Sequence, residues 1–179
     1  VDTANKNNDI AALKNVMNEF YSRDNSRKIR SSIRARAKAG LYRASFNPIG
    51  YRKSPDNHNK LIVDEETAWI VKRIFALSNA GMGAHKIVKT FYEEQVPCPS
   101  WWLYSRGEKD YSKRFENPEN KYVWSHTAIR EIIRNPLYLG HTVMCKTEVI
   151  FKVGKFKNVP ESEWIRADNT HEPLVSQEV

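Results

Sequence analysis

Apolar residues recur three or four positions apart near the start of the chain, and this period predicts an amphipathic helix over residues 9–24. The positions are Ile10, Leu13, Met17 and Phe20. A separate, thinner apolar stripe follows within the basic run, at Ile29, Ile33 and Ala37. It stops at Gly40, a residue typical of helix C-terminal caps. Because so narrow a stripe buries little apolar surface, we expect this long helix to lie on a partner or to bridge two domains.

Three more helices are predicted after a connector at residues 41–60, which is rich in Asn-Pro, Gly and Ser-Pro turn signals. Asp64 is expected to cap the first, which ends near Gly81, and Ser125 is expected to cap the last. The second and third helices are predicted over residues 84–95 and 127–134. The inward-facing side chains of the second helix are expected to be Ile87, Val88, Phe91 and Tyr92.

The remaining segments carry weaker patterns. Residues 1–8 are polar and are expected to be a disordered or linker segment, and residues 98–123 show no clear period and are expected to be a long loop or insertion. Three strands are predicted near the end of the chain, over residues 141–146, 148–153 and 163–167.

Together these elements predict a helix-dominated α+β fold. We expect a long basic helix, then a compact helical domain with a helix-turn-helix-like pair, an arrangement found in many DNA-binding proteins, and a small C-terminal β-sheet. The predicted division places the long helix in residues 1–40, the connector in 41–60 and the compact domain in 61–179. The chain begins without Met, so we expect it to be a fragment of a longer protein.

Positive charge is concentrated in the long helix and just beyond it. Between Arg23 and Arg43 eight Lys and Arg side chains face one acid, Asp24, so +7 of the net charge of +8 lies in 21 residues. Such a concentration is the electrostatic footprint of a polyanion, most often nucleic acid. A solvated helix face is the alternative, but i,i+4 pairs between acids and bases are too few to stabilise it. The candidate DNA contacts in this helix are Arg27, Lys28, Arg30, Arg34, Arg36 and Lys38.

Two further groups of side chains are candidates for DNA contact. In the connector, bases alternate with aromatic residues as they do in arms that enter the minor groove, although an ordinary surface loop is the alternative. These residues are Arg43, Phe46, Tyr51, Arg52 and Lys53. On the third short helix, outward side chains suited to base edges and phosphates are Ser125, His126, Thr127, Arg130 and Arg134. Purely structural helices remain the alternative for this second group.

Candidate catalytic or metal-binding chemistry is not apparent. The five histidines are dispersed, Cys98 and Cys145 have no zinc-like spacing, and no glycine-rich phosphate loop occurs, so we expect no metal and no cofactor. A mean hydropathy of −0.66 argues against a membrane protein. Two cysteines without a disulfide framework are consistent with a reducing, cytoplasmic location.

Several segments, in this order and spacing, resemble the large serine recombinases of phages and conjugative transposons, within the resolvase/invertase superfamily. The segments are Asn18–Asp24 with Ser26–Ile29, Asn47–Tyr51, Val63–Glu66, Val71–Phe75 with Gly81, Lys86-Ile87, Trp124 with Ile129, Ile132 and Ile133, Arg134–Gly140, and the tail His171–Ser176.

The resemblance implies a bacterial site-specific DNA recombinase that integrates or excises a mobile element, with a serine nucleophile that attacks the DNA backbone. That serine belongs to a Tyr-x-Arg-x-Ser motif after a strand. Residues 21–26 differ from the motif by one position and follow a helix, so neither Ser22 nor Ser26 is expected to be catalytic. The resemblance therefore assigns residues 1–40 to the end of the catalytic region and the long basic linking helix, and residues 61–179 to the recombinase (DNA-binding) domain. The chain is expected to bind attachment-site DNA without cutting it.

The resemblance also implies that the long helix crosses the DNA near the cleavage point and helps subunits to pair as dimers and tetramers. Lys28 falls where related small recombinases carry an arginine near the scissile phosphate. Two alternatives stay open: a helix-turn-helix transcriptional regulator, and a protein-interaction module whose basic helix binds an acidic partner.

Overall fold

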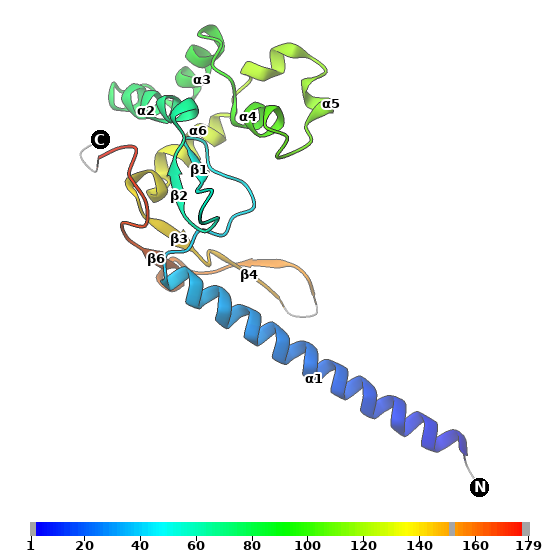
Figure 1. Cartoon of the computed structure of the whole chain (residues 1–179). Coiled ribbons are helices and arrows are strands. Elements are labelled where there is room, and N and C mark those ends of the chain that lie inside the picture. Colours follow the sequence, from blue (N-terminus) through cyan, green and yellow to red (C-terminus); the bar gives the residue numbers. More distant parts are fainter. Residues whose placement is uncertain (1–2, 151–152, 177–179) are drawn as a thin grey trace. The chain divides into compact units, whose positions relative to one another are not determined.

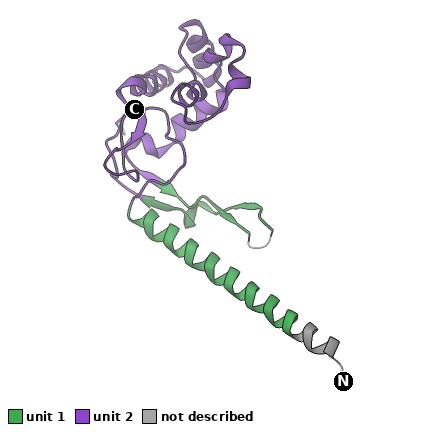
Figure 2. Ribbon diagram, turned by 45° about the vertical axis from the view of Figure 1, so that its right-hand side comes forward, with its two compact units in different colours: residues 1–39, 143–166 green, residues 40–142, 167–179 purple. Residues whose placement is uncertain are grey.

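The structure, a computed structural model, describes residues 3–150 and 153–176. The chain divides into two compact units, which Figure 2 colours separately. Unit 1 contains residues 1–39 and 143–166, and unit 2 contains residues 40–142 and 167–179. The predicted class, an α+β fold dominated by helix, is confirmed.

Unit 1 consists of one long helix and a β-hairpin. Helix α1 runs over Thr3–Lys38, and strands β4 (Thr147–Val149) and β5 (Phe156–Asn158) pair antiparallel, with Val149 opposite Phe156 (Figure 1). The prediction that residues 1–8 are disordered or a linker is wrong from Thr3 onward, because the helix extends to that residue. A helix that is already nucleated adds one hydrogen bond for each further residue, even a polar one.

Unit 2 begins with a short hairpin and continues into a group of helices. Strand β1 (Tyr51–Lys53) pairs antiparallel with β2 (Leu61–Val63). The next helices are α2 (Glu65–Asn79), α3 (Ala84–Glu93) and α6 (His126–Arg134), which confirm the three predicted helices with small shifts at their ends. Helix α3 packs on both α2 and α6.

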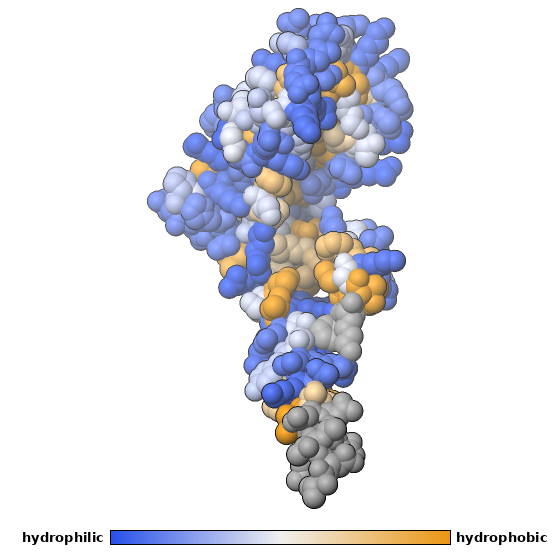
Figure 3. Space-filling model, turned by 90° about the vertical axis from the view of Figure 1, so that its right-hand side faces the viewer, coloured by the Kyte–Doolittle hydropathy of each residue, from blue (hydrophilic) through white to orange (hydrophobic). Residues whose placement is uncertain are grey.

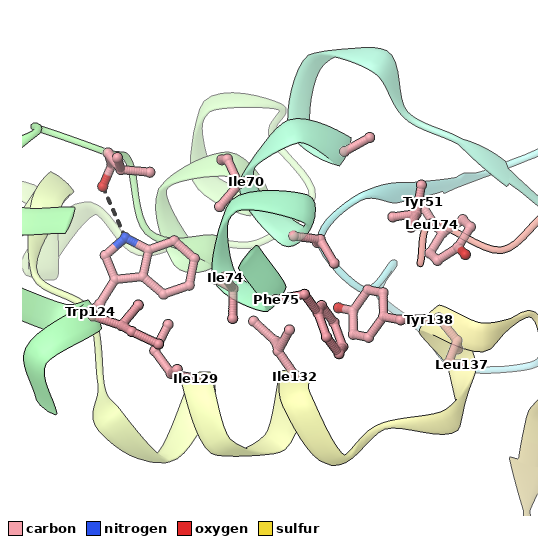
Figure 4. Packing of buried hydrophobic residues seen from close by; sticks show 14 of the residues in the cluster. Tyr51, Ile70, Ile74, Phe75, Trp124, Ile129, Ile132, Leu137, Tyr138 and Leu174 are labelled. Carbon is pink, nitrogen blue, oxygen red and sulfur yellow. Dashed lines mark hydrogen bonds between the residues drawn. The ribbon is translucent and has the colours of Figure 1, made fainter. Parts of the chain in front are cut away.

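The core of unit 2 lies between these helices. Ile74 of α2, Ile87 and Phe91 of α3, and Ile129 of α6 are all fully buried. Trp124 closes one end of the core, where its indole Nε1 donates to the carbonyl of Val96 at 2.9 Å (Figure 4). Tyr92, predicted to face inward, is 46% exposed instead, because its position falls at the edge of the buried stripe of α3.

Residues 98–123 are folded rather than a long loop. They form α4 (Pro99–Ser105), α5 (Ser112–Phe115) and the 3-10 helix η1 (Pro118–Tyr122). Aromatic rings hold these pieces together, and the ring of Trp101 meets that of Phe115 edge to face at 5.3 Å. Helices this short contain about two turns or fewer, so their apolar residues do not repeat often enough to show a period in the sequence.

The start of α2 is tied to α4 by an ion pair. Asp64 occupies the predicted N-cap position, but its carboxylate accepts from the hydroxyl of Thr67 at 2.6 Å and from Arg106 at 2.8 Å rather than from the helix backbone. Burial opposes the ionisation of Asp64, yet these two partners outweigh it and hold the pKa of its carboxyl below the usual range.

The C-terminal part forms separate strand pairs instead of the single small sheet that was predicted. Besides the β4–β5 hairpin, β3 (Thr142–Met144) pairs with β6 (Ile165–Ala167). The predicted strand at 148–153 ends at Val149, and residues 151–152 lie outside the described residues. Sequence patterns missed β5, whose three residues are all exposed and therefore do not alternate between buried and exposed sides.

After α6, unit 2 contains the 3-10 helix η2 (Pro136–Leu139). A third 3-10 helix, η3 (Glu161–Glu163), belongs to unit 1. The tail of unit 2 packs through Leu174, which is buried, and through His171, whose Nε2 lies 2.8 Å from the carbonyl of Leu137. Since a carbonyl only accepts, that nitrogen carries the proton, and burial lowers the pKa of His171.

Candidate nucleic-acid interface

Five basic side chains of α1 lie along one face of the helix. At about 100° per residue, their positions fall within an arc of about 80°. They are Arg23, Arg27, Arg30, Arg34 and Lys38, and all are exposed. We call this set the basic stripe. Its regular spacing gives unit 1 a linear array of positive charge.

Two of the predicted contacts on α1 lie off this stripe. Lys28 and Arg36 project from other faces of the helix at the same 100° spacing. The ammonium of Lys28 is 2.8 Å from the carboxylate of Asp24, just as the guanidinium of Arg23 on the stripe is 3.1 Å from that of Glu19. The helix therefore divides the predicted basic residues into four that share a face with Arg23 and two that do not.

The β4–β5 hairpin brings further positive charge to unit 1 that the sequence analysis did not select. One guanidinium nitrogen of Arg30 donates to the carbonyl of Val149 at 2.8 Å, which joins α1 to the hairpin. Lys146, Lys155 and Lys157 are exposed on the hairpin or beside it, and the ammonium of Lys146 lies 4.9 Å from the ring centroid of Trp164. A count of charges over residues 146–157 could have identified this group.

In unit 2 the connector is folded rather than a free arm. The hydroxyl of Tyr42 donates to the carbonyl of Phe46 at 2.9 Å, and the backbone N–H of Tyr42 donates to Asn59 at 2.8 Å. Burial raises the pKa of Tyr42 to about 12. These bonds fold the connector back on itself, so in unit 2 the connector is not the extended arm that the sequence predicted.

The prediction that Tyr51 contacts DNA is wrong. Its side chain is 1% exposed, and its hydroxyl donates to the carbonyl of Glu172 at 2.7 Å. The ring also meets that of His171 edge to face at 4.8 Å. Tyr51 therefore belongs to the core of unit 2 and cannot reach DNA in this fold. The sequence pattern placed an aromatic residue correctly in the connector but could not show on which side of β1 it lies.

The other connector candidates remain accessible in unit 2. Arg43, Phe46 and Arg52 are exposed and Lys53 is half-buried. Lys109 joins them, because its ammonium lies 5.1 Å from the ring centroid of Phe46. This contact gives the connector a cation from residues 98–123, a segment in which the sequence analysis identified no functional residue.

Helix α6 presents its predicted residues to solvent at its N-terminus and along one side. Ser125 caps the helix by accepting from the N–H of Thr127 at 3.2 Å. The ring of His126 stacks on that of His85, at the start of α3, with centroids 4.6 Å apart. Thr127, Arg130 and Arg134 are exposed, as Ser125 and His126 are. Their outward direction is therefore as predicted.

Comparison with protein families matches residues 65–179 to the model of the family described as Recombinase. The match covers more than half of the chain. The chain belongs to the Recombinase family. The resemblance drawn from the sequence is thereby confirmed at the level of this domain, which includes α2, α3 and α6. Helix α1, with its basic stripe, and the whole connector precede the matched residues.

A comparison with solved structures finds a chain titled "Crystal Structure of a LSR-DNA Complex", with 19% sequence identity and a TM-score of 0.48. The alignment covers 85% of this recombinase chain and 34% of the other, so the present chain spans about a third of that protein's length. A comparison with curated proteins gives no match.

Within the described ranges no group of three or more His, Cys, Asp or Glu side chains is arranged to hold a metal ion. The hydroxyl of Ser26 donates to the carbonyl of Ser22 at 2.9 Å, a bond of the helix to itself rather than a contact with a general base. No helix in the described part is both long and apolar enough to cross a membrane.

Proposed function

We propose that this chain is the DNA-binding part of a large serine recombinase that integrates and excises a bacterial mobile element. The observation that carries the proposal is the basic stripe of α1 on a chain whose residues 65–179 match the Recombinase family. Double-stranded attachment-site DNA is the proposed partner. Strand exchange would use a serine outside this chain. Neither DNA binding nor strand exchange would need a metal or cofactor bound by this chain.

The stripe is suited to phosphates by its length and its regularity. From Arg23 to Lys38 it extends about 22 Å, at 1.5 Å per residue. Arg and Lys side chains on one line can neutralise successive phosphates, release counterions and so contribute most of the sequence-independent affinity. Those contacts would set the position of the protein on the duplex without reading its sequence.

Sequence reading is assigned to unit 2. Thr127 and Arg130 of α6 present a hydroxyl and a guanidinium, which are chemically suited to base edges. Arg43, Phe46 and Arg52 of the connector would add contacts to the backbone or the minor groove. We also propose that α3 and α6 act as a helix-turn-helix pair. Subunits would pair through the exposed apolar residues near the start of α1.

A matched pair of double variants tests the stripe. Arg27→Ala with Lys38→Ala removes two charges on the stripe, and Lys28→Ala with Arg36→Ala removes the same residue types off it. On a random duplex across a salt series, the first pair is expected to flatten the slope of log K against log salt by about 1.8, or 0.9 per contact. The second pair is expected to leave the slope nearly unchanged. Fluorescence anisotropy gives both slopes.

Equal slopes for the two double variants would remove the stripe as the phosphate-binding face. Affinity for duplex DNA that does not depend on salt would favour the alternative in which the basic helix binds an acidic protein. Neither variant touches Arg30 or Arg34, so the result is independent of the groove described below.

A second test addresses specificity. A preferred duplex is first selected from a random library, and Arg130→Ala is then compared with wild type on that duplex and on a scrambled one. The expected loss is about 1–3 kcal/mol on the selected duplex and less on the scrambled one, since a bidentate base contact discriminates by that amount. An equal loss on both would mean that Arg130 contacts phosphate only.

A further inference from the structure

Unit 1 contains a groove between α1 and the β4–β5 hairpin, with a volume of about 760 Å³. Ile29 and Ile33 form its helix side, and Val149 and Phe156 form its hairpin side. The bond from Arg30 to the carbonyl of Val149 holds the two sides together. The groove is thus a feature of unit 1 alone.

The apolar residues of the groove are unusually exposed for their size. Phe156 is 75% exposed, Ile29 60% and Val149 45%. Figure 3 shows apolar side chains gathered around the hairpin and the part of α1 beside it. Single exposed apolar residues are ordinary, but a contiguous group that lines a groove marks a surface where another molecule binds.

The charge around this apolar floor has one dominant sign. Arg30 and Arg34 of the basic stripe form part of the lining, and Glu148 is the acid among the described lining residues. Lys155 and Lys157 are exposed on the hairpin nearby in the chain. A partner that fills this groove therefore needs apolar groups at its centre and negative charge at its edges.

Neither DNA nor a second copy of α1 meets that requirement. Phosphates match the arginines but leave Ile29 and Phe156 exposed. The apolar residues at the start of α1, from Ile10 to Phe20, lie on nearly the opposite face of the helix from Ile29 and Ile33 at 100° per residue. In a two-fold symmetric dimer the two helices contact each other through the same single face. Because Ile10–Phe20 and the groove lie on nearly opposite faces of α1, such a dimer cannot place the apolar residues Ile10–Phe20 of each copy in the groove of the other.

We propose that this groove binds an acidic amphipathic helix of another protein. Apolar side chains spaced at i, i+3, i+4 and i+7 would pack on Ile29, Ile33 and Phe156, in the helix-in-groove mode of recognition. Glu and Asp side chains on either side of that stripe would meet Arg34 and the hairpin lysines. The site is separate from the proposed DNA contacts except where Arg30 and Arg34 border it.

The test uses a synthetic helical peptide of about 18 residues, five turns, with Leu on one stripe and Glu elsewhere. Fluorescein-labelled peptide is titrated with the whole chain. Saturable binding is expected, and Phe156→Ala is expected to weaken it about tenfold, as loss of an aromatic anchor does. The matched control is Phe20→Ala, because Phe20 is 72% exposed on α1 but lies outside the groove. The Phe20→Ala variant is expected to bind the peptide with the same affinity as wild type.

Charge is tested with the same peptide carrying Lys in place of Glu. Wild type is expected to bind the Glu peptide more tightly, and Arg34→Glu is expected to reduce that preference. Equal affinity for the two peptides, or no binding to either, would overturn the proposal. So would self-association in analytical ultracentrifugation that Phe156→Ala abolishes, since a second copy would then occupy the groove. Displacement of the peptide by duplex DNA, with Phe156→Ala weakening both ligands equally, would assign the groove to DNA.

Discussion

The two units of this recombinase differ most in what they do with aromatic and aliphatic side chains. In unit 2, Phe91 is fully buried between α3 and its neighbours, whereas in unit 1 Phe20 and Phe156 are 72% and 75% exposed. Burial of a large apolar side chain stabilises a fold by about 1.5–3 kcal/mol, and an exposed one contributes almost nothing. Unit 2 is therefore stabilised by its own core, while these exposed rings contribute little to the stability of unit 1.

Charged groups follow the same division. The carboxylate of Asp64 is 7% exposed and is held by Arg106, whereas the carboxylate of Asp24, 38% exposed, pairs with a lysine that is 74% exposed. The first pair fixes α4 to the start of α2, and the second only neutralises one turn of α1. Two ion pairs with the same 2.8 Å separation thus differ in how strongly solvent screens them.

The largest expected effect comes from removing a buried ring. Phe91→Ala in α3 is expected to lower the free energy of unfolding by about 3–5 kcal/mol, because the lost packing leaves a cavity. Phe156→Ala is expected to change it by less than about 0.5 kcal/mol, as surface substitutions do. Urea denaturation followed by circular dichroism measures both. Comparable losses in the two variants would show that the hairpin contributes to the core and would end the contrast between the units.

A smaller effect is expected from a pair of glycines with positive φ. Gly50 has φ +89°, and a Cβ there would lie 2.7 Å from Leu174 and 2.9 Å from Val71. Gly154, on the hairpin, has φ +68°, but a Cβ there would meet no atom within 4 Å among the described residues. Both alanine variants are expected to lose about 1–2 kcal/mol from the left-handed backbone. Only Gly50→Ala is expected to lose a further 1–3 kcal/mol or so from overpacking.

Thermal unfolding of the two glycine variants checks this expectation. If Gly154→Ala destabilises the chain as much as Gly50→Ala does, crowding at Gly50 is not the cause. If neither variant is destabilised, the positive φ itself carries no penalty in this fold.

The sequence could predict α2, α3 and α6 of unit 2 because each repeats its apolar positions over about two and a half turns or more and is bounded by a capping or turn signal. Ser125 and Gly81 mark such ends, and both occupy those positions in the structure. The short helices at 98–123 could not be predicted in this way, because rings from different segments, such as Trp101 and Phe115, stabilise them.

The candidate site was predictable to the extent that it depends on local charge. The concentration of Arg and Lys on α1 is visible in the sequence, and helical spacing alone separates the stripe from Lys28 and Arg36. Tyr51 was wrongly predicted to contact DNA because its burial depends on packing against distant segments. Lys109 was missed because its contact with Phe46 joins segments far apart in the sequence. Local patterns carry no information on such pairs.

The smallest of the expected effects concerns the two aspartates and depends on pH. Asp64→Asn is expected to cost about 1–3 kcal/mol at pH 7, because Arg106 loses its buried charged partner. The pKa of Asp64 is lowered in the folded state, so the stability it contributes is complete above its unfolded pKa of about 3.9 and is lost as pH falls through the folded value. The difference in unfolding free energy between wild type and Asp64→Asn should therefore vanish in acid. Asp24→Asn, at an exposed pair, should cost less than about 1 kcal/mol at neutral pH. Urea titrations from pH 7 to about pH 2 measure both differences, and a constant gap for Asp64→Asn across that range would mean that packing, rather than charge, links α4 to α2.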